Sequence, residues 1–235
     1  MPFRLLVVTV VALVPAACSG GVGGSTEPSA TAAPAPSATV SLPAGVPSSY
    51  PDAVNAADLP PASLVPVGST PSELWPVAAP EGTQYAVVAY TEPSGDPFRQ
   101  VHGVVVWRRS AGEPPWQPVF AASDPPDAGV VEIRATIGDV TGDGSPDALT
   151  FADTGGSGAC GIWRVLDLAG NTQAFRRHTC DTTIDISADP IGLVIREAVF
   201  APGDAHCCPS AWKISTLTYE PASGWTVESI IEQPT

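Results

Sequence analysis

From about residue 64 onward, short runs of β-branched and aromatic residues recur along the chain and predict a protein built from strands. Residues 85–91 and 102–108 are two such runs, each bounded by proline or glycine. In residues 131–137 apolar and polar side chains alternate, which is typical of a strand with one buried face. Further runs of this kind cover residues 148–152, 162–168, 173–179, 193–200, 212–219 and 225–231.

Turn sequences rich in glycine, proline, aspartate and asparagine separate these runs, as in residues 94–97 and 169–171. Helical patterns are nearly absent, and only residues 71–78 favour a single helical turn. The pattern therefore predicts an all-β, mainly antiparallel fold of about nine strands, either a sandwich or an incomplete propeller-like sheet. Nine strands are too few for a full propeller of four-stranded blades.

The first 17 residues have the pattern of a secretory signal, because Arg4 precedes an apolar run over residues 5–14 that is too short for a stable membrane span. The order Ala16-Ala17-Cys18 resembles the cleavage and lipidation site of bacterial lipoprotein signal peptides, although Pro15 stands where that family usually has an aliphatic residue. The resemblance implies that Cys18 is acylated and holds the chain on the outer face of the cytoplasmic membrane. The alternative is an ordinary secretory signal in which Cys18 plays no part.

The stretch that follows differs in composition from the rest of the chain. Residues 19–63 are mostly Gly, Ser, Ala, Thr and Pro with no basic residue, so they cannot bury enough apolar surface to offset chain entropy. We expect residues 18–63 to form a disordered tether that begins at the lipidated Cys18. Residues 64–235 contain all six tryptophans, and their length suffices for a single β-rich globular domain with one core.

The chain of 235 residues has a formal net charge of −14. With Lys213 as its one lysine, it lacks the clustered basic residues that nucleic acid requires. The same balance argues against electrostatic docking on anionic lipid, which leaves the acyl group at Cys18 as the membrane contact.

One loop carries oxygen-bearing side chains at the spacing of a calcium site, with Gly144 in the position of a sharp turn. Side-chain oxygens would come from Asp139, Thr141 and Asp143, a carbonyl from Ser145, and a direct or water-mediated contact from Asp147. This segment resembles the Asp-x-Asp-Gly-Asp-Gly-x-x-Asp loops of FG-GAP and VCBS repeats, the blade units of integrin-like propellers. Thr141 and Thr150 replace carboxylates, so we favour the alternative interpretation of the loop as a tight interstrand turn in which Asp143 bonds the backbone.

Beyond Cys18, four cysteines remain, and outside the cell an even number predicts two disulfides. Cys160 and Cys180 are symmetric about the turn of a hairpin centred on Gly170, so they could face each other. That pairing leaves Cys207 and Cys208 to form a strained vicinal bridge or to stay free. We favour the alternative, in which both hairpin cysteines pair with the adjacent pair, because it satisfies every sulfur without a strained ring.

The segment around the adjacent cysteines invites a zinc interpretation through His206, but zinc needs a fourth ligand and reduced thiols, so disulfides are favoured. Residues 203–210 resemble a segment of actinobacterial secreted proteins and lipoproteins of the LppP/LprE type. The resemblance implies a cell-envelope location and no particular activity.

The chain lacks the familiar hydrolase, metalloprotease and phosphate-binding motifs. His102, His178 and His206 lie in unrelated contexts. We therefore expect a lipid-anchored extracytoplasmic domain with a non-catalytic binding or structural role, its partner an envelope protein or a glycan. The alternative is a cell-envelope hydrolase whose site is assembled from residues distant in the sequence.

Overall fold

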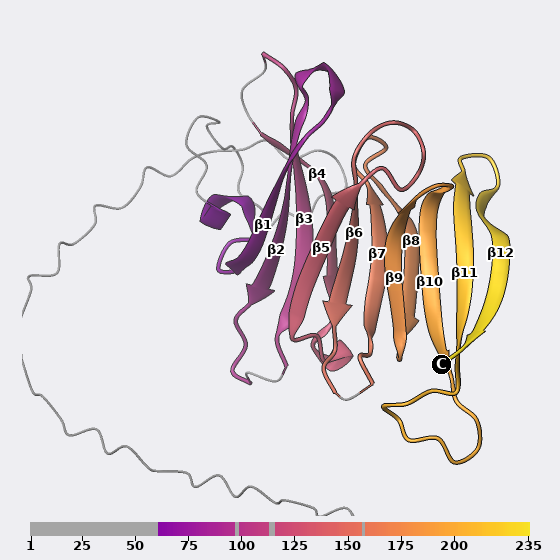
Figure 1. Cartoon of the computed structure of the whole chain (residues 1–235). Helices are drawn as coiled ribbons and strands as arrows, with labels where there is room; N and C mark the ends of the chain where they lie inside the picture. The colour runs from indigo at the N-terminus through magenta and orange to yellow at the C-terminus, as the bar shows by residue number, and fades with distance from the viewer. Residues whose placement is uncertain (1–60, 97–98, 113–115, 157) are drawn as a thin grey trace, which may run out of the picture. The chain divides into compact units, whose positions relative to one another are not determined.

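The computed structural model describes residues 61–235 except residues 97–98, 113–115 and 157. The predicted signal peptide, Cys18 and nearly all of the predicted tether lie outside the described residues. The described residues form three four-stranded antiparallel sheets, each a meander of four strands consecutive in the chain (Figure 1). The predicted all-β, antiparallel architecture is confirmed, and each sheet has the strand order of a propeller blade.

The first sheet contains β1 (Thr70–Ala78), β2 (Gln84–Glu92), β3 (Val101–Arg109) and β4 (Gln117–Asp124). The second contains β5 (Glu132–Gly138), β6 (Asp147–Asp153), β7 (Gly161–Asp167) and β8 (Thr172–Thr179). The third contains β9 (Thr182–Ala188), β10 (Ile191–Val199), β11 (Ala211–Glu220) and β12 (Gly224–Pro234). The helical segments of the described residues are the short 3-10 turns η2 (Pro61–Leu64), η3 (Pro80–Gly82) and η4 (Pro126–Ala128).

The structure adds three strands to those predicted. The helical turn predicted for residues 71–78 is wrong, because this segment is strand β1. Pro71 and Pro76 lie on an edge strand that pairs with β2 alone, the kind of strand to which proline is largely confined within sheets. The strands β4 and β9 were also not predicted.

The sheets are joined by apolar side chains that one sheet presents to the next. Val87 and Val106 of the first sheet share a buried cluster with Leu166 of the second. In the same way, Leu149 of the second sheet packs with Leu193 of the third. The alternation of side chains along each strand thus buries both faces of the middle sheet.

Residue 64, the predicted start of the globular domain, packs on the first sheet. Leu64 is buried against the first sheet, and its carbonyl oxygen accepts a hydrogen bond of 2.7 Å from the indole Nε1 of Trp107.

Among the described residues, no helix has the length and apolar character needed to cross a membrane.

Candidate functional site

The loop that resembles a calcium site connects β5 to β6, and its last aspartate is the best-defined residue in it. Asp147 is fully buried, and its Oδ2 atom accepts hydrogen bonds from the backbone N–H groups of Val140 and Thr141 and from the Thr141 hydroxyl. Its other oxygen, Oδ1, is buried without a hydrogen-bond partner among the described residues. Burial raises the pKa of Asp147 to about 6, against the lowering effect of the three hydrogen bonds.

The other two aspartates of this loop bind its own backbone. The carboxylate of Asp139 accepts hydrogen bonds from the N–H groups of Gly142 and Gly144, at 2.7 and 3.1 Å. Asp143 accepts one from the N–H of Ser145 at 2.7 Å. Within the described part of the chain, no group of three or more His, Cys, Asp or Glu side chains lies close enough together to hold a metal ion. This arrangement is that of a tight interstrand turn, and calcium binding by the loop is left to experiment.

The cysteines pair differently from the connectivity that we favoured. Cys160 forms a disulfide with Cys180, so the preference for bridges to the adjacent pair is wrong. The reason lies in the strand register, because Gly161 of β7 pairs with Thr179 of β8. Cys160 precedes Gly161 and Cys180 follows Thr179, so the two cysteines meet at the open end of the hairpin. Cys207 and Cys208 are exposed and free. Among the described residues, His206, Cys207 and Cys208 do not form a group that could hold a metal ion, and the imidazole Nδ1 of His206 lies 3.5 Å from Asp181 Oδ1.

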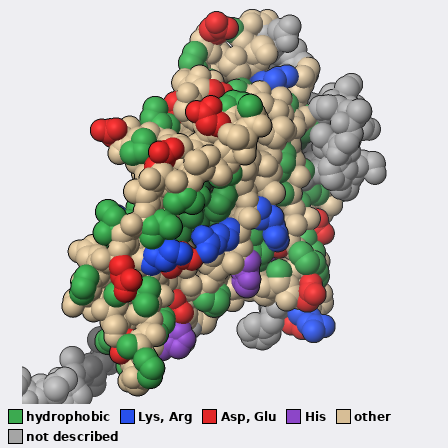
Figure 2. All heavy atoms as spheres, turned by 90° about the vertical axis from the view of Figure 1, so that its right-hand side faces the viewer, with side chains coloured by type: hydrophobic (Ala, Val, Ile, Leu, Met, Phe, Trp, Pro, Cys, Tyr) green, Lys and Arg blue, Asp and Glu red, His purple; other side chains and the backbone are tan. Residues whose placement is uncertain are grey.

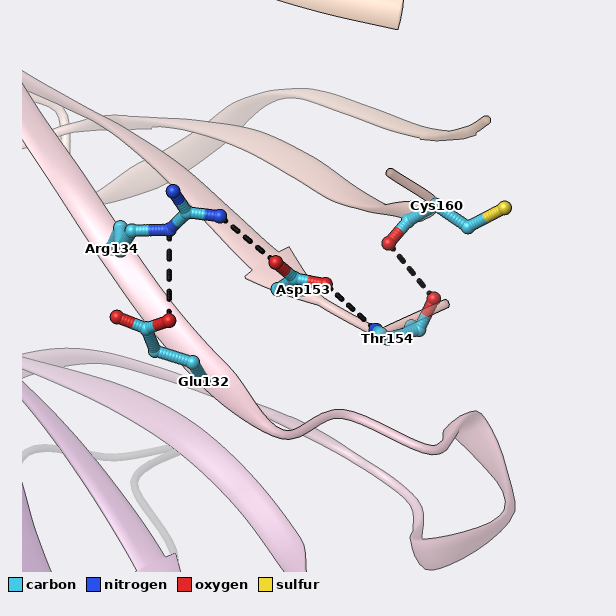
Figure 3. Close-up of polar contacts among 6 residues, drawn as sticks. Glu132, Arg134, Asp153, Thr154 and Cys160 are labelled. Atoms are coloured by element: carbon cyan, nitrogen blue, oxygen red, sulfur yellow. Dashed lines mark hydrogen bonds and ion pairs between the residues drawn. The ribbon is translucent and has the colours of Figure 1, made fainter. Parts of the chain in front are cut away.

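A polar network holds the end of β6 in the second sheet, and its residues are shown in Figure 3. Asp153 accepts a hydrogen bond of 2.9 Å from Arg134, whose Nε lies 3.9 Å from a carboxylate oxygen of Glu132 (Figure 3). Beyond the strand, the hydroxyl of Thr154 donates to the carbonyl of Cys160 at 2.9 Å and closes the glycine-rich loop (Figure 3).

A small hollow of about 200 Å³ lies beside this network, between the second sheet and β9. The guanidinium carbon of Arg134 lies over the ring of Phe151, 5.3 Å from its centroid. Phe151 packs on Trp163 with ring centroids 4.4 Å apart. The indole N–H of Trp163 is buried and has no partner among the described residues. The hollow is too small for a drug-sized ligand, which typically needs about 300 Å³ or more.

One cluster brings together a hydroxyl, an imidazole and a carboxylate, the groups of a hydrolase site. Thr91, His102 and Asp124 are cross-strand neighbours on β2, β3 and β4, and the Thr91 hydroxyl lies 3.3 Å from His102 Nδ1. However, His102 is 7% exposed and Asp124 only 2%. Burial lowers the pKa of His102, and the nearby Asp124 charge offsets this only in part. The carboxylate of Asp124 pairs with the buried guanidinium of Arg164, so the cluster joins two sheets rather than facing a substrate.

A larger candidate site is a groove of about 530 Å³ on the third sheet. A row of cross-strand neighbours, Thr183, Arg196 and Ile214, crosses its floor from β9 to β11, and Ile231 of β12 continues this row beside the groove. Because side chains alternate along a strand and Ile195 of β10 belongs to the core, this row faces away from the second sheet.

A second row of the same face supplies the aromatic residue of the groove. Trp212 of β11 stands between Ala198 of β10 and Gln233 of β12, and it is half-buried. Arg196 is held on this face by an ion pair of 2.7 Å with Asp185. The groove thus combines a flat aromatic ring, aliphatic side chains and a few fixed polar groups, a mixture common in ligand sites. Its lining residues are Thr183, Arg196, Trp212, Ile214, Gln233, Pro234 and Thr235.

The edge strand β12 extends the apolar surface around this groove. Ile231 lies opposite Ile214 on the groove face, whereas Ile230 lies opposite buried Ser215 on the other face, and both isoleucines are about three-fifths exposed. Figure 2, which looks onto the β12 side of the molecule, shows hydrophobic side chains gathered beside several Lys and Arg side chains. The groove was not predicted from the sequence, because its residues come from four strands whose register cannot be read from local patterns.

Comparisons of the chain with protein-family models, with curated proteins and with solved structures find no match. The argument for a function therefore rests on the residues themselves.

Proposed function

We propose that the protein is a lipid-anchored, extracytoplasmic binding protein of the cell envelope, and that it holds its ligand in the groove of the third sheet without chemical change. The signal-like residues 1–17 and Cys18 support the location, together with the likeness of residues 203–210 to envelope lipoproteins of the LppP/LprE type. The Cys160–Cys180 disulfide supports it further, because disulfides persist in oxidising compartments outside the cytoplasm.

The observation that carries the proposal is Trp212 in an open groove among Arg196, Gln233 and Thr183. An indole ring offers a flat apolar face, and the neighbouring guanidinium, amide and hydroxyl groups offer donors and acceptors at its rim. Sugar rings have the complementary make-up, with C–H groups on their faces and hydroxyls at their edges. The groove thus suits a glycan of the cell wall better than an apolar protein segment.

A binding role agrees with the state of three acid–base groups of the described residues. The imidazole of His102 and the carboxylate of Asp124 are buried in an intersheet network, and Asp147 is bound to loop backbone. General acid–base catalysis requires such a group within hydrogen-bond reach of a substrate. The groove itself contributes Arg196 as its charged side chain, which suits binding rather than proton transfer.

The proposal is tested by co-sedimentation of the purified full chain, carrying Cys18→Ser to keep it free of lipid, with insoluble cell-wall polysaccharide. We expect the protein to sediment with the polysaccharide and Trp212→Ala to reduce the bound fraction at least tenfold. Trp116→Ala is the matched control, since Trp116 lies in the first sheet's apolar cluster, remote in sequence from the groove. Equal binding by Trp212→Ala and the parent chain would overturn the proposed surface.

A further inference from the structure

The loop between β10 and β11 carries two adjacent thiols that no part of the proposed binding function uses. This loop, residues 200–210, projects past the ends of the strands (Figure 1). The sulfur atoms of Cys207 and Cys208 lie 2.8 Å apart, and both side chains are exposed. Two thiols in contact, accessible from solvent, can lose two protons and two electrons to form one bond, which closes the strained ring of a vicinal disulfide.

Hydrogen bonds hold the loop that presents these thiols. The Oδ2 atom of Asp204 accepts from the N–H of Ala201 and from both the N–H and the hydroxyl of Ser210, at distances of 2.7 to 3.0 Å. The N–H of Cys208 donates to the carbonyl of Ala205 at 2.9 Å. The ends of the loop are thus tied together across the cysteine pair, which keeps the two sulfurs on one short, supported segment.

The loop also lies against the end of the hairpin that carries the structural disulfide. His206 lies beside Asp181, the residue that follows Cys180, and its ring packs edge-on against Phe200 with centroids 5.4 Å apart. Cys160 and Cys180 already satisfy each other. Cys207 and Cys208 can therefore pair with each other but not with the hairpin cysteines.

We propose that Cys207 and Cys208 form a thiol–disulfide exchange site, which reduces a small-molecule disulfide and closes to a vicinal disulfide. In the first step one cysteine loses its proton to solvent and its thiolate attacks a sulfur of the disulfide. This step forms a mixed disulfide and releases one thiolate, which takes up a proton. The second cysteine then loses its proton and attacks the first, forming the Cys207–Cys208 bond and releasing the second thiol. Two protein thiols are oxidised and one disulfide is reduced to two thiols, so the exchange balances.

The order of the two steps follows from the contact between the thiols. The hydrogen bond with Cys207, followed by the charge of Cys207, raises the pKa of Cys208. A raised pKa favours the thiol form of Cys208, so the proposal gives Cys208 the resolving role and Cys207 the role of the attacking thiolate.

Proteolytic mapping of the full chain provides the test. The protein is equilibrated with glutathione and glutathione disulfide at graded ratios, and free thiols are blocked with N-ethylmaleimide. Trypsin, which cuts after Lys and Arg, releases residues 197–213 as one peptide with both cysteines, whereas Cys160 and Cys180 fall on separate peptides. As the disulfide fraction rises, we expect this peptide to lose both maleimide groups together and to become lighter by two hydrogens, with no link to another peptide.

Cys208→Ser removes the resolving thiol, so most of this variant should retain glutathione on Cys207, whereas the parent chain should carry only traces. Maleimide on both cysteines at every ratio would overturn the proposal. Links from this peptide to Cys160, to Cys180 or to a second chain, or stable glutathione on the parent protein, would also overturn it. Since both thiols are exposed, the melting temperature of Cys208→Ser should match that of the parent chain, which separates loss of chemistry from loss of fold.

Discussion

Arg164 on β7 donates a hydrogen bond to the carboxylate of Asp124 on β4, and this buried ion pair links the second sheet to the first. The two side chains are 4% and 2% exposed, and Arg176 adds a weaker contact with Asp124 at 4.0 Å. A buried charge that loses its partner is costly, whereas replacing both charges by apolar groups is often neutral. We therefore expect this pair to be important for the stability of the contact between these two sheets.

The first prediction concerns this pair. Asp124→Asn should lower the free energy of unfolding by about 3–5 kcal/mol, because it leaves the Arg164 guanidinium buried without a counter-charge. The double variant Asp124→Leu/Arg164→Met should recover most of that loss. Urea denaturation, monitored by tryptophan fluorescence, measures the free energy of unfolding of both variants.

The exposed pair between Asp185 and Arg196 supplies the control, since Asp185→Asn should cost at most about 1 kcal/mol. If Asp124→Asn costs no more than Asp185→Asn, the buried pair contributes nothing special to stability and this account of the two sheets is mistaken.

The second prediction is a fall in stability with rising pH that originates at Asp147. Its folded-state pKa of about 6 lies above the usual value of 3.8, so the folded protein holds this proton more tightly than the unfolded chain. The stabilising contribution is complete below the usual pKa and is lost as the pH rises through about 6, with a difference of roughly 3 kcal/mol. Asp147→Asn stays neutral at every pH, and its amide oxygen can accept the same hydrogen bonds, so this variant should lack the decline.

The test compares the free energies of unfolding of the parent chain and of Asp147→Asn between pH 4 and pH 7.5. His102 acts in the opposite sense, because its lowered pKa gives stability that is lost as the pH falls through its usual value of 6.5. That effect is common to both proteins and cancels in their difference. Parallel profiles for the two proteins would contradict the assignment to Asp147.

The third prediction concerns calcium at the loop between β5 and β6. Since both oxygens of Asp139 and one oxygen of Asp143 are engaged by backbone N–H groups, we expect no shift in melting temperature between chelator and ~5 mM calcium, the range in which extracellular modules bind. A site with a dissociation constant on the order of 10⁻⁴–10⁻³ M would instead add roughly 1–2 kcal/mol. A calcium-dependent rise that Asp143→Asn abolishes would show that the loop is a metal site.

The fourth prediction concerns the membrane anchor. If Cys18 carries acyl chains, the wild-type protein should fractionate with membranes and Cys18→Ser should appear in the culture medium, because two or more chains anchor a protein stably. Immunoblots of membrane and medium fractions measure the distribution. Retention of Cys18→Ser in the membrane fraction would refute lipid anchoring at this residue.

Strands with a continuous apolar run were predictable from the sequence. The runs at 85–91 and 102–108 match β2 and β3 to within a residue or two, since both strands are buried almost throughout. β1 escaped prediction because its prolines and Glu73 dilute the pattern on an edge strand, where one side of the ladder needs no partner.

Features that depend on register between strands were beyond local patterns. The symmetry of Cys160 and Cys180 about the hairpin turn allowed their pairing, but only the register of β7 with β8 decides it. The groove on the third sheet is a stronger case, because Arg196, Ile214 and Ile231 become neighbours through two separate strand pairings. Nothing in the sequence around any one of them distinguishes it from an ordinary strand residue.

The central claim is that the protein binds a wall glycan on the groove face of the third sheet. Hydroxyl-radical footprinting of the full-length Cys18→Ser chain, with and without solubilised cell-wall glycan, tests it most directly. Ile230 and Ile231 are equally exposed neighbours on opposite faces of β12, so they form an internal pair. We predict that the glycan slows oxidation of Trp212 and Ile231 several-fold and leaves Ile230 and the distant Val67 unchanged. Equal protection of Ile230 and Ile231, or none at Trp212, would contradict the account.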